Sequence, residues 1–301
     1  MSIVIGPLHS IVANYIDVDI SNQRLTPKLN ESMKRIERKI SFHKMNGLVA
    51  LITGGASGLG LACINRFLKQ GISHVHFCDL PTSKGEEIVK TMDSSLVTYH
   101  PVDVTHDSEV EDMFKKIQEK NSKLNCLVQC AGIGVAFRCY NINKRSMHSM
   151  EEFNRVMNVN VFGTFNVLRR ACHIMADNQP DTNGQRGVII NTSSIAAYEG
   201  QIGQVAYSAA SGALESMTLP LARDLSSVGI RVCTILPGVF DHTKMIEPVS
   251  EKGKQLLASM ITFPSKLGLP DDFARLAQHI IENNYLNGES IRLDGAIRMP
   301  P

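Results

Sequence analysis

Short apolar runs alternate along the chain with longer segments in which apolar residues recur at helical spacing. The apolar runs have the length of strands and are Leu48–Thr53, His74–Asp79, Leu96–His100, Leu124–Cys130, Gly187–Asn191, Ile230–Leu236 and Ser290–Leu293. Helical spacing is found in Leu61–Gln70, Gly85–Met92, Ser108–Glu119, Met150–Ala176, Val205–Ser226 and Asp271–Glu282. Apolar strands that alternate with helices are typical of a parallel sheet covered on both faces. The pattern therefore predicts an α/β fold with a single doubly wound parallel sheet.

This alternation continues from residue 46 to residue 301, and no internal repeat or low-complexity linker divides it. We therefore predict one domain over residues 46–301 rather than two. Residues 1–45 carry a different pattern and are predicted to form an N-terminal extension.

The extension has the pattern of a basic amphipathic helix. Thr26-Pro27 suits an N-cap and a first-turn proline. One apolar face follows, formed by Leu29, Met33, Ile36 and Ile40. Its basic residues are Arg24, Lys28, Lys34, Arg35, Arg38, Lys39 and Lys44. Such a helix is compatible with a mitochondrial targeting element, but the first twenty residues contain no Lys or Arg, which is unlike such a signal. The alternative is a surface helix packed on the domain, or an extension without fixed structure.

Composition and charge exclude several classes of function. The chain has 31 Lys and Arg against 29 Asp and Glu, and no Trp, which argues against direct nucleic-acid binding. Its apolar runs are far shorter than the ~20 residues of a membrane span. The seven cysteines are odd in number and form no CxxC pair, which indicates a reducing compartment without disulfides. We expect no metal site, because His74 and His76 are better interpreted as strand-flank histidines.

A glycine-rich turn follows the first predicted strand and opens the first helix. Gly54 allows a tight turn, Gly58 allows backbone N–H groups to approach a pyrophosphate, and Gly60 allows the helix to pack closely on the strand. Asp79 ends the second strand, where a carboxylate accepts ribose hydroxyls and repels a 2′-phosphate. These features predict a Rossmann-type sheet that binds NAD rather than NADP. The alternative is a loop-closing turn with a surface aspartate.

Further motifs at fixed positions follow the later strands. Cys130-Ala131-Gly132 follows the fourth strand, Pro237-Gly238 follows the sixth, and Ser194 and Tyr207 lie between them. With the glycine turn, this spacing resembles the short-chain dehydrogenase/reductase family. The resemblance extends over residues 46–301, includes the insertion Phe137–Glu151, and is strongest to members that act on 3-hydroxyacyl-CoA thioesters and hydroxysteroids.

The resemblance implies a site with two parts, a cofactor site and a catalytic tetrad. The implied NAD-binding residues are Gly54, Ser57, Gly58, Leu59, Gly60, Asp79, Asp103, Val104, Cys130, Ala131, Gly132, Tyr207, Pro237 and Gly238. In the tetrad, Tyr207 exchanges a proton with the substrate oxygen and Ser194 hydrogen-bonds that oxygen. Asn160 fixes a helix bend and a proton-relay water. Taken alone, Ser194 could instead be a strand-end cap and Asn160 a structural amide.

The fourth tetrad member differs from the family pattern Tyr-x-x-x-Lys. Ser211 stands four residues after Tyr207, where a helix would place a lysine ammonium beside the phenol. The lysine would lower the phenol pKa from its unperturbed ~10 and hydrogen-bond the nicotinamide ribose. Ser211 supplies neither the charge nor the reach, so we expect low activity or an alkaline optimum.

Two smaller departures affect the same half of the site. Gln129 precedes Cys130 where the family usually has asparagine. After Pro237-Gly238, Asp241-His242 occupy the places of a Gly-Thr pair whose threonine binds the nicotinamide carboxamide, and Thr243 falls one place later. The sequence therefore predicts an intact adenosine half and an altered nicotinamide half.

Two functions remain open at this stage. The first is an NAD-dependent oxidoreductase of a secondary alcohol or ketone, a 3-hydroxyacyl-CoA or hydroxysteroid, in which Phe240–Phe263 forms an apolar lid or a core helix. The second is a weakly catalytic NAD-binding scaffold subunit, for example in mitochondrial transfer-RNA processing. The resemblance also implies a homo-oligomer, a tetramer, and a mitochondrial location, with the cytoplasm as the alternative. We expect a small-molecule substrate and no membrane partner.

Overall fold

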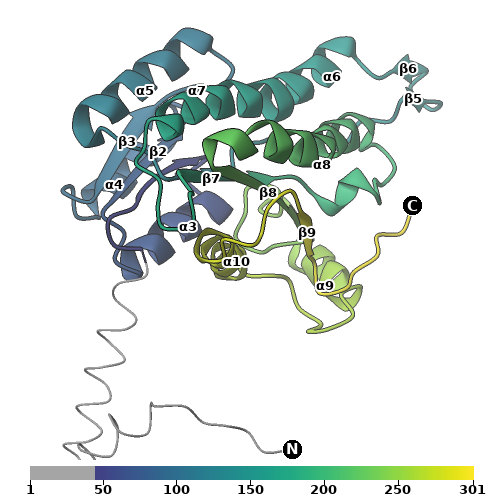
Figure 1. The fold of residues 1–301 in the computed structure, drawn as a ribbon. Helices are drawn as coiled ribbons and strands as arrows, with labels where there is room; N and C mark the ends of the chain where they lie inside the picture. Colours follow the sequence, from purple (N-terminus) through teal and green to yellow (C-terminus); the bar gives the residue numbers. More distant parts are fainter. Residues whose placement is uncertain (1–44) are drawn as a thin grey trace, which may run out of the picture. The chain divides into compact units, whose positions relative to one another are not determined.

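A computed structural model describes residues 45–301 and contains one parallel sheet of seven strands in the order β3-β2-β1-β4-β7-β8-β9 (Figure 1). The strands are β1 (Val49–Thr53), β2 (His74–Asp79), β3 (Val97–Pro101), β4 (Cys126–Gln129), β7 (Gly187–Thr192), β8 (Ile230–Pro237) and β9 (Ser290–Leu293). Each corresponds to a strand predicted from an apolar run, and every neighbouring pair is parallel. The predicted doubly wound Rossmann-type α/β fold is confirmed.

Helices cover both faces of this sheet (Figure 1). Side chains that alternate along β1 separate the two cores: Ile52 packs with Phe67 and Phe273, whereas Leu51 packs with Phe114 and Leu168. The first face carries α3 (Gly58–Lys69), α4 (Gly85–Lys90) and α10 (Pro270–Glu282). The second face carries α5 (Asp107–Asn121), α7 (Thr164–Ala176) and α8 (Val205–Asp224).

The predicted long helix Met150–Ala176 contains a change of winding. It consists of α6 (Met150–Met157), a π-helical segment (Asn158–Gly163) and α7. At Gly163, an added Cβ would lie 2.7 Å from Val104 Cγ2, so only glycine allows the helix to approach the end of the sheet this closely. The π turn places Asn160 toward the loop after β4.

Two elements lie outside the sheet and its helices. The insertion contains a short antiparallel hairpin of β5 (Tyr140–Asn141) and β6 (Ser146–Met147). The segment after β8 leads to α9 (Glu251–Ser259), in which no residue is fully buried. Its Leu257 and Ala258 pack instead on a small separate cluster with Ile246, Ile261 and Ile297. The segment therefore has the packing of a lid rather than of a core helix.

Several expectations concern features away from the site. His74 is the first residue of β2 and His76 the third, and both side chains are buried. Within residues 45–301, no helix is long and apolar enough to cross a membrane. Nor does this part of the chain contain a cluster of three or more potential metal ligands. The predicted basic helix of the extension lies outside the described residues.

Candidate active site

The glycine turn brings the backbone of β1, β4 and α3 into close contact. Gly54 has φ +66°, and a Cβ there would lie 2.7 Å from the Cys130 carbonyl carbon. A Cβ on Gly60 would lie 2.3 Å from the Gly54 carbonyl oxygen, and Gly58 has φ +51°. Each glycine is thus required by sterics or by a left-handed conformation. The Ser57 side chain does not cap α3, and the first turn carries no acid, so the helix N-terminus can receive an anion.

Asp79 connects the end of β2 to this turn. Its carboxylate accepts hydrogen bonds from the Ala56 N–H at 3.0 Å and from the Leu80 N–H at 2.9 Å. Each oxygen keeps a lone pair for a further donor. The carboxylate is therefore oriented by the backbone and can still accept a hydroxyl group.

A single cavity of about 1360 Å³ lies at the carboxyl ends of the strands, where doubly wound sheets bind ligands. All the predicted site residues line this one cavity: Gly54, Ser57, Gly58, Leu59, Gly60, Asp79, Asp103, Val104, Cys130, Ala131, Gly132, Asn160, Ser194, Tyr207, Pro237 and Gly238. Asp103 and Val104 lie just beyond β3 rather than at its last residue. The fold thus brings the predicted residues together, while their roles stay predictions.

Tyr207 lies in the first turn of α8, and its phenol is hydrogen-bonded to Ser194, which follows β7. Burial raises the pKa of the Tyr207 phenol above its usual range, while the hydrogen bond with Ser194 acts in the opposite direction. Ser194 Oγ also accepts from the Ala196 N–H at 3.1 Å, so this serine caps the turn that follows β7 as well. No cation contributes to the pKa of Tyr207.

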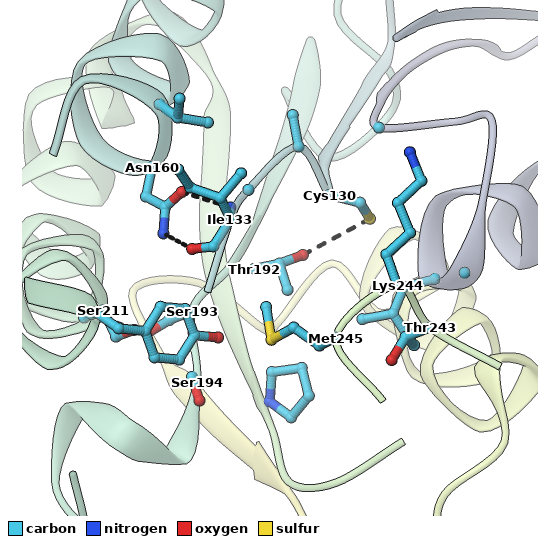
Figure 2. Close-up of a pocket in the computed structure, with 18 of the residues that line it drawn as sticks. Cys130, Ile133, Asn160, Thr192, Ser193, Ser194, Ser211, Thr243, Lys244 and Met245 are labelled. Carbon is cyan, nitrogen blue, oxygen red and sulfur yellow. Dashed lines mark hydrogen bonds between the residues drawn. The ribbon is translucent and has the colours of Figure 1, made fainter. Parts of the chain in front are cut away.

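Ser211 lies one helical turn after Tyr207, is buried and lines the cavity (Figure 2). Its carbonyl oxygen accepts a hydrogen bond from Ser193 Oγ at 2.8 Å, which ties α8 to the end of β7. Position 211 thus lies at the wall of the cavity, one helical turn from Tyr207, and carries a neutral side chain.

Asn160 uses both ends of its amide on one residue (Figure 2). Its Oδ1 accepts from the Ile133 N–H at 2.8 Å, and its Nδ2 donates to the Ile133 carbonyl at 2.9 Å. These bonds join the π turn to the loop after β4. The contacts are those of a positioning residue, and the predicted contact with a relay water stays a prediction.

The loop after β8 accommodates the displaced threonine. His242 has φ +52° and is exposed, and neither it nor Asp241 lines the cavity. Thr243 does line it and lies over the glycine turn, where its Cγ2 is 3.5 Å from the position of an added Gly58 Cβ. Gln129 is buried away from the cavity and donates to Asn191 Oδ1 at 3.0 Å.

Sequence reasoning assigned no role in the site to two parts of the wall. One is Lys244, which belongs to the predicted lid segment Phe240–Phe263, follows Thr243 and lines the cavity. The other is the C-terminal segment with Met299, whose N–H donates to Glu199 Oε2 at 3.0 Å. Glu199 also accepts from Arg292 at 2.8 Å, and this guanidinium lowers the pKa of the Glu199 carboxyl. Neither part has a local sequence signal, because both are placed by tertiary contacts.

Comparison with known proteins identifies the family. A profile described as short chain dehydrogenase matches residues 48–254. The chain belongs to this family. A Bos taurus protein named 3-hydroxyacyl-CoA dehydrogenase type-2 is 52% identical over 257 residues, 85% of this chain and 97% of that protein. The Drosophila melanogaster protein of the same name is 50% identical over 253 residues, 84% of this chain and 98% of its own length.

A solved structure agrees with these sequences. The crystal structure of 3-hydroxyacyl-CoA dehydrogenase type-2 from Mycobacterium avium is 37% identical, has a TM-score of 0.80, and covers 86% of this chain and 99% of its own. This short-chain dehydrogenase therefore resembles 3-hydroxyacyl-CoA dehydrogenase type-2 over most of its length. The family implies an oxidoreductase with a nicotinamide dinucleotide cofactor and a small-molecule substrate.

The residues of the cavity fit such a dinucleotide. The glycine turn leaves a space that side chains at Gly54 or Gly60 would disrupt, and the α3 N-terminus faces it without a competing acid. The oriented Asp79 carboxylate lies at one side of the turn. These residues would hold the adenosine and pyrophosphate parts of the cofactor.

Proposed function

We propose that this protein is an NAD-dependent oxidoreductase that interconverts a secondary alcohol and a ketone. The observation that carries the proposal is one cavity with the glycine turn on one side and Tyr207 with Ser194 on another. A bound nicotinamide cofactor would supply the hydride transfer to or from the substrate carbon. The side chains of this protein bind and orient the substrate and move its proton.

Tyr207 and Ser194 divide the work on the substrate oxygen. Ser194 Oγ accepts from the Ala196 N–H, and its single O–H, which is directed at the Tyr207 phenol in the free protein, can turn to donate to the substrate oxygen. The Tyr207 side chain takes the hydroxyl proton as the phenolate during oxidation and returns it as the phenol during reduction. With Ser211 in place of a lysine, the phenol keeps its raised pKa, so turnover at neutral pH is impaired.

Asp79 favours NAD over NADP. Its two oxygens are held by backbone N–H groups, so the carboxylate cannot easily turn away from the ribose. A 2′-phosphate placed there would meet a fixed negative charge.

The apolar lid supports a 3-hydroxyacyl-CoA or hydroxysteroid substrate. Met245, Ile246 and Leu257 line the cavity from the segment after β8, and Met299 lines it from the C-terminal segment. Such side chains suit an acyl chain or a flat ring system.

Exposed apolar side chains on the helices support a homo-oligomer, for which we propose a tetramer. Phe162 and Phe165 are exposed at the start of α7, and Val205 and Leu219 are exposed on α8. Large exposed apolar side chains on neighbouring helices are typical of subunit interfaces. Light scattering of the purified protein would give a mass of four chains.

The second candidate is an NAD-binding scaffold subunit with little catalysis, for example in mitochondrial transfer-RNA processing. The observation that favours it is Ser211, which leaves the cofactor cradle intact while depriving Tyr207 of a cation. Both candidates carry a proposed mitochondrial location, which imaging of the full-length protein with a C-terminal tag would test.

One experiment separates the two candidates. Purified protein is incubated with NAD and a short 3-hydroxyacyl-CoA from pH 7 to pH 10, and NADH formation is recorded beside an NAD titration. We expect NAD binding throughout and turnover that climbs with pH. NAD binding without turnover at any pH favours the scaffold, and absence of NAD binding contradicts both.

A further inference from the structure

The loop after β8 is held firmly beside the glycine turn. The Gly268 N–H donates to the Val239 carbonyl at 3.0 Å, and the Asp241 N–H donates back to the Gly268 carbonyl at 2.9 Å. Thr243 Oγ1 donates to the Phe240 carbonyl at 3.2 Å. Ile246, whose N–H donates to the Thr243 carbonyl at 3.0 Å, anchors the end of the loop in a buried cluster. The position of Thr243 over Gly58 is therefore fixed by the fold.

Lys244 extends from this fixed loop along the cofactor cavity. Figure 2 shows its stem running past Cys130 and its ammonium on the other side of the cavity from Ser211. Within residues 45–301 the ammonium has no carboxylate partner. Two acids lie three residues from Lys244 in sequence: Asp241 faces Lys254 at 3.7 Å and His242 at 3.8 Å, and Glu247 forms no ion pair with Lys244 within the described residues.

The charges around the cavity make this ammonium distinctive. Among the described residues, two cations line the cavity, Arg155 and Lys244. Arg155 is paired with Glu152 at 2.7 Å, so its charge is balanced within α6. Lys244 therefore carries an unpaired positive charge near the glycine turn. The other positive charge at this turn is the partial charge of the α3 N-terminus.

We propose that Lys244 binds the cofactor pyrophosphate, which would lie between its ammonium and the N-terminus of α3. This rests on the proposed nicotinamide dinucleotide function and adds a phosphate ligand to it. A flexible ammonium suits a phosphate as a point charge, and its stem can follow the phosphate without moving the loop. Position 211 supplies no cation, so Lys244 provides the positive charge of the cofactor site from the opposite wall.

The test compares ligands with and without the pyrophosphate. Calorimetric titrations of NAD, ADP and adenosine are made with the unmodified protein, with Lys244→Met and with Lys252→Met. Methionine keeps an unbranched stem without the charge. Lys252 is the matched control, because it is an exposed lysine on α9 that does not line the cavity.

We expect Lys244→Met to raise the Kd of NAD and ADP about tenfold or more, as for the loss of one hydrogen bond to a charged group. Adenosine affinity and the affinities of Lys252→Met should stay unchanged. The difference between Lys244→Met and the unmodified protein should shrink as salt rises, because exposed charges are screened. An unchanged melting temperature confirms that Lys244→Met is folded.

Two results overturn the proposal. Equal ADP affinity in the unmodified protein and in Lys244→Met would remove Lys244 from the phosphate site. An equal loss for ADP and adenosine would mean that the substitution acts on the shape of the cavity instead. Failure of the unmodified protein to bind NAD at all would contradict the proposed function itself. Binding that depends on Lys244 without any turnover would leave this inference standing and contradict the oxidoreductase.

Discussion

We expect the chemistry of Tyr207 to depend on the single residue four positions later. Burial raises the pKa of its phenol, and the described contacts offer only the neutral hydroxyl of Ser194 to oppose that effect. A unit charge at ~4 Å contributes about 4 kcal/mol at an effective dielectric constant near 20, so even half of that exceeds a tenfold change in rate. The difference between an active and a nearly silent site can therefore lie in one side chain.

Replacing Ser211 by lysine should restore turnover at neutral pH. The phenol must lose its proton to act as a base in alcohol oxidation, and its raised pKa makes the phenolate about tenfold rarer for each pH unit below that pKa. The unmodified protein should therefore speed up continuously from pH 7 to pH 10. Ser211→Lys should be more than about tenfold faster at pH 7, with a flatter profile. Initial rates of NADH formation across this range give both quantities.

Ser211→Met is the control for that comparison, because methionine fills about the same space as lysine without its charge. A gain with methionine equal to that with lysine would mean that packing, not charge, limits the phenol. High and pH-independent turnover of the unmodified protein would contradict the role given to the missing lysine.

The glycine turn gives a second prediction at this scale. A Cβ at Gly60 would lie 2.3 Å from the Gly54 carbonyl oxygen, so Gly60→Ala must displace α3 from β1. We expect the Kd for NAD to rise about tenfold or more, ~1.4 kcal/mol, measured by titration beside a melting curve. Gly212→Ala is the control: it has open space on α8, and alanine favours a helix interior by about 0.5–1 kcal/mol. Unchanged NAD affinity in Gly60→Ala would contradict the proposal that the glycine turn binds the cofactor.

At the scale of elements, strands were easier to predict than the details between them. Every residue of β1 and β8 is buried, and burial on both faces leaves such mainly apolar sequences few alternatives to a strand. The π turn around Asn160 has no comparable signal, because it depends on Val104 and Ile133 from other parts of the chain. Helical periodicity alone therefore predicted one long helix over Met150–Ala176, and the bend at Asn160 was expected only from the family resemblance.

The same reasoning explains what was missed in the site. Gly54 and Asp79 belong to a local motif whose spacing is set by one strand, one turn and one helix. Lys244 and Met299 reach the cavity only because the loop after β8 and the C-terminal segment fold back over it. Their positions depend on pairings between distant residues, which no local pattern encodes.

The C-terminal segment is held by an ion cluster that can be tested as a unit. Glu199 binds Arg292 at 2.8 Å, Arg298 at 3.4 Å and the Met299 N–H at 3.0 Å. Glu199→Gln removes the charge and should release Met299 from the cavity wall. We expect a higher KM for the acyl substrate and a melting temperature lower by about 2–4 °C, the shift for ~1 kcal/mol in a domain of this size.

Glu247→Gln is the matched control, because Glu247 is exposed and its side chain has no described partner. Its KM and melting temperature should stay at the values of the unmodified protein. If Glu199→Gln behaved in the same way, the ion cluster would not hold the segment.

At the scale of the whole molecule, the site lies at the carboxyl ends of the strands. We expect a different region to determine the stability of the fold in acid. Parallel strands bring their carboxyl ends together, so residues as distant as Gly54 and Pro237 meet at one cavity. The outer strands β2 and β3 instead bury three histidines: His74, His76 and His100. None of them lines the cavity, so stability and cofactor binding can be altered separately.

These histidines are hydrogen-bonded in their neutral form. His76 Nε2 donates to Asn121 Oδ1 at 2.7 Å, which leaves His76 Nδ1 to accept from His100 Nε2 at 2.9 Å. Burial lowers the pKa of His76 to about 3 and that of His100 to about 4. The charges of Lys116 and Lys120 on α5 and a neighbouring histidine act in the same direction. Protonation would place two N–H groups against each other.

Acid should therefore destabilise the fold before it protonates most carboxylates. Because the folded pKa values lie below the unfolded value of 6.5, the unfolded state binds more protons between pH 6.5 and about pH 4. The contribution of these histidines is fully present above pH 6.5 and is lost as the pH falls through that window. Urea unfolding at several pH values should give a slope of about 1.4 kcal/mol per pH unit for each histidine.

His100→Asn should flatten this slope, because the asparagine amide can still donate to His76 Nδ1 while one titrating group is removed. His173→Asn is the matched control, since His173 is exposed on α7 and has no described partner. It should keep the slope of the unmodified protein. An equal slope in all three proteins would place the acid sensitivity among the surface carboxylates instead. NAD affinity at pH 7 should be the same in all three proteins, because neither His100 nor His173 lines the cavity.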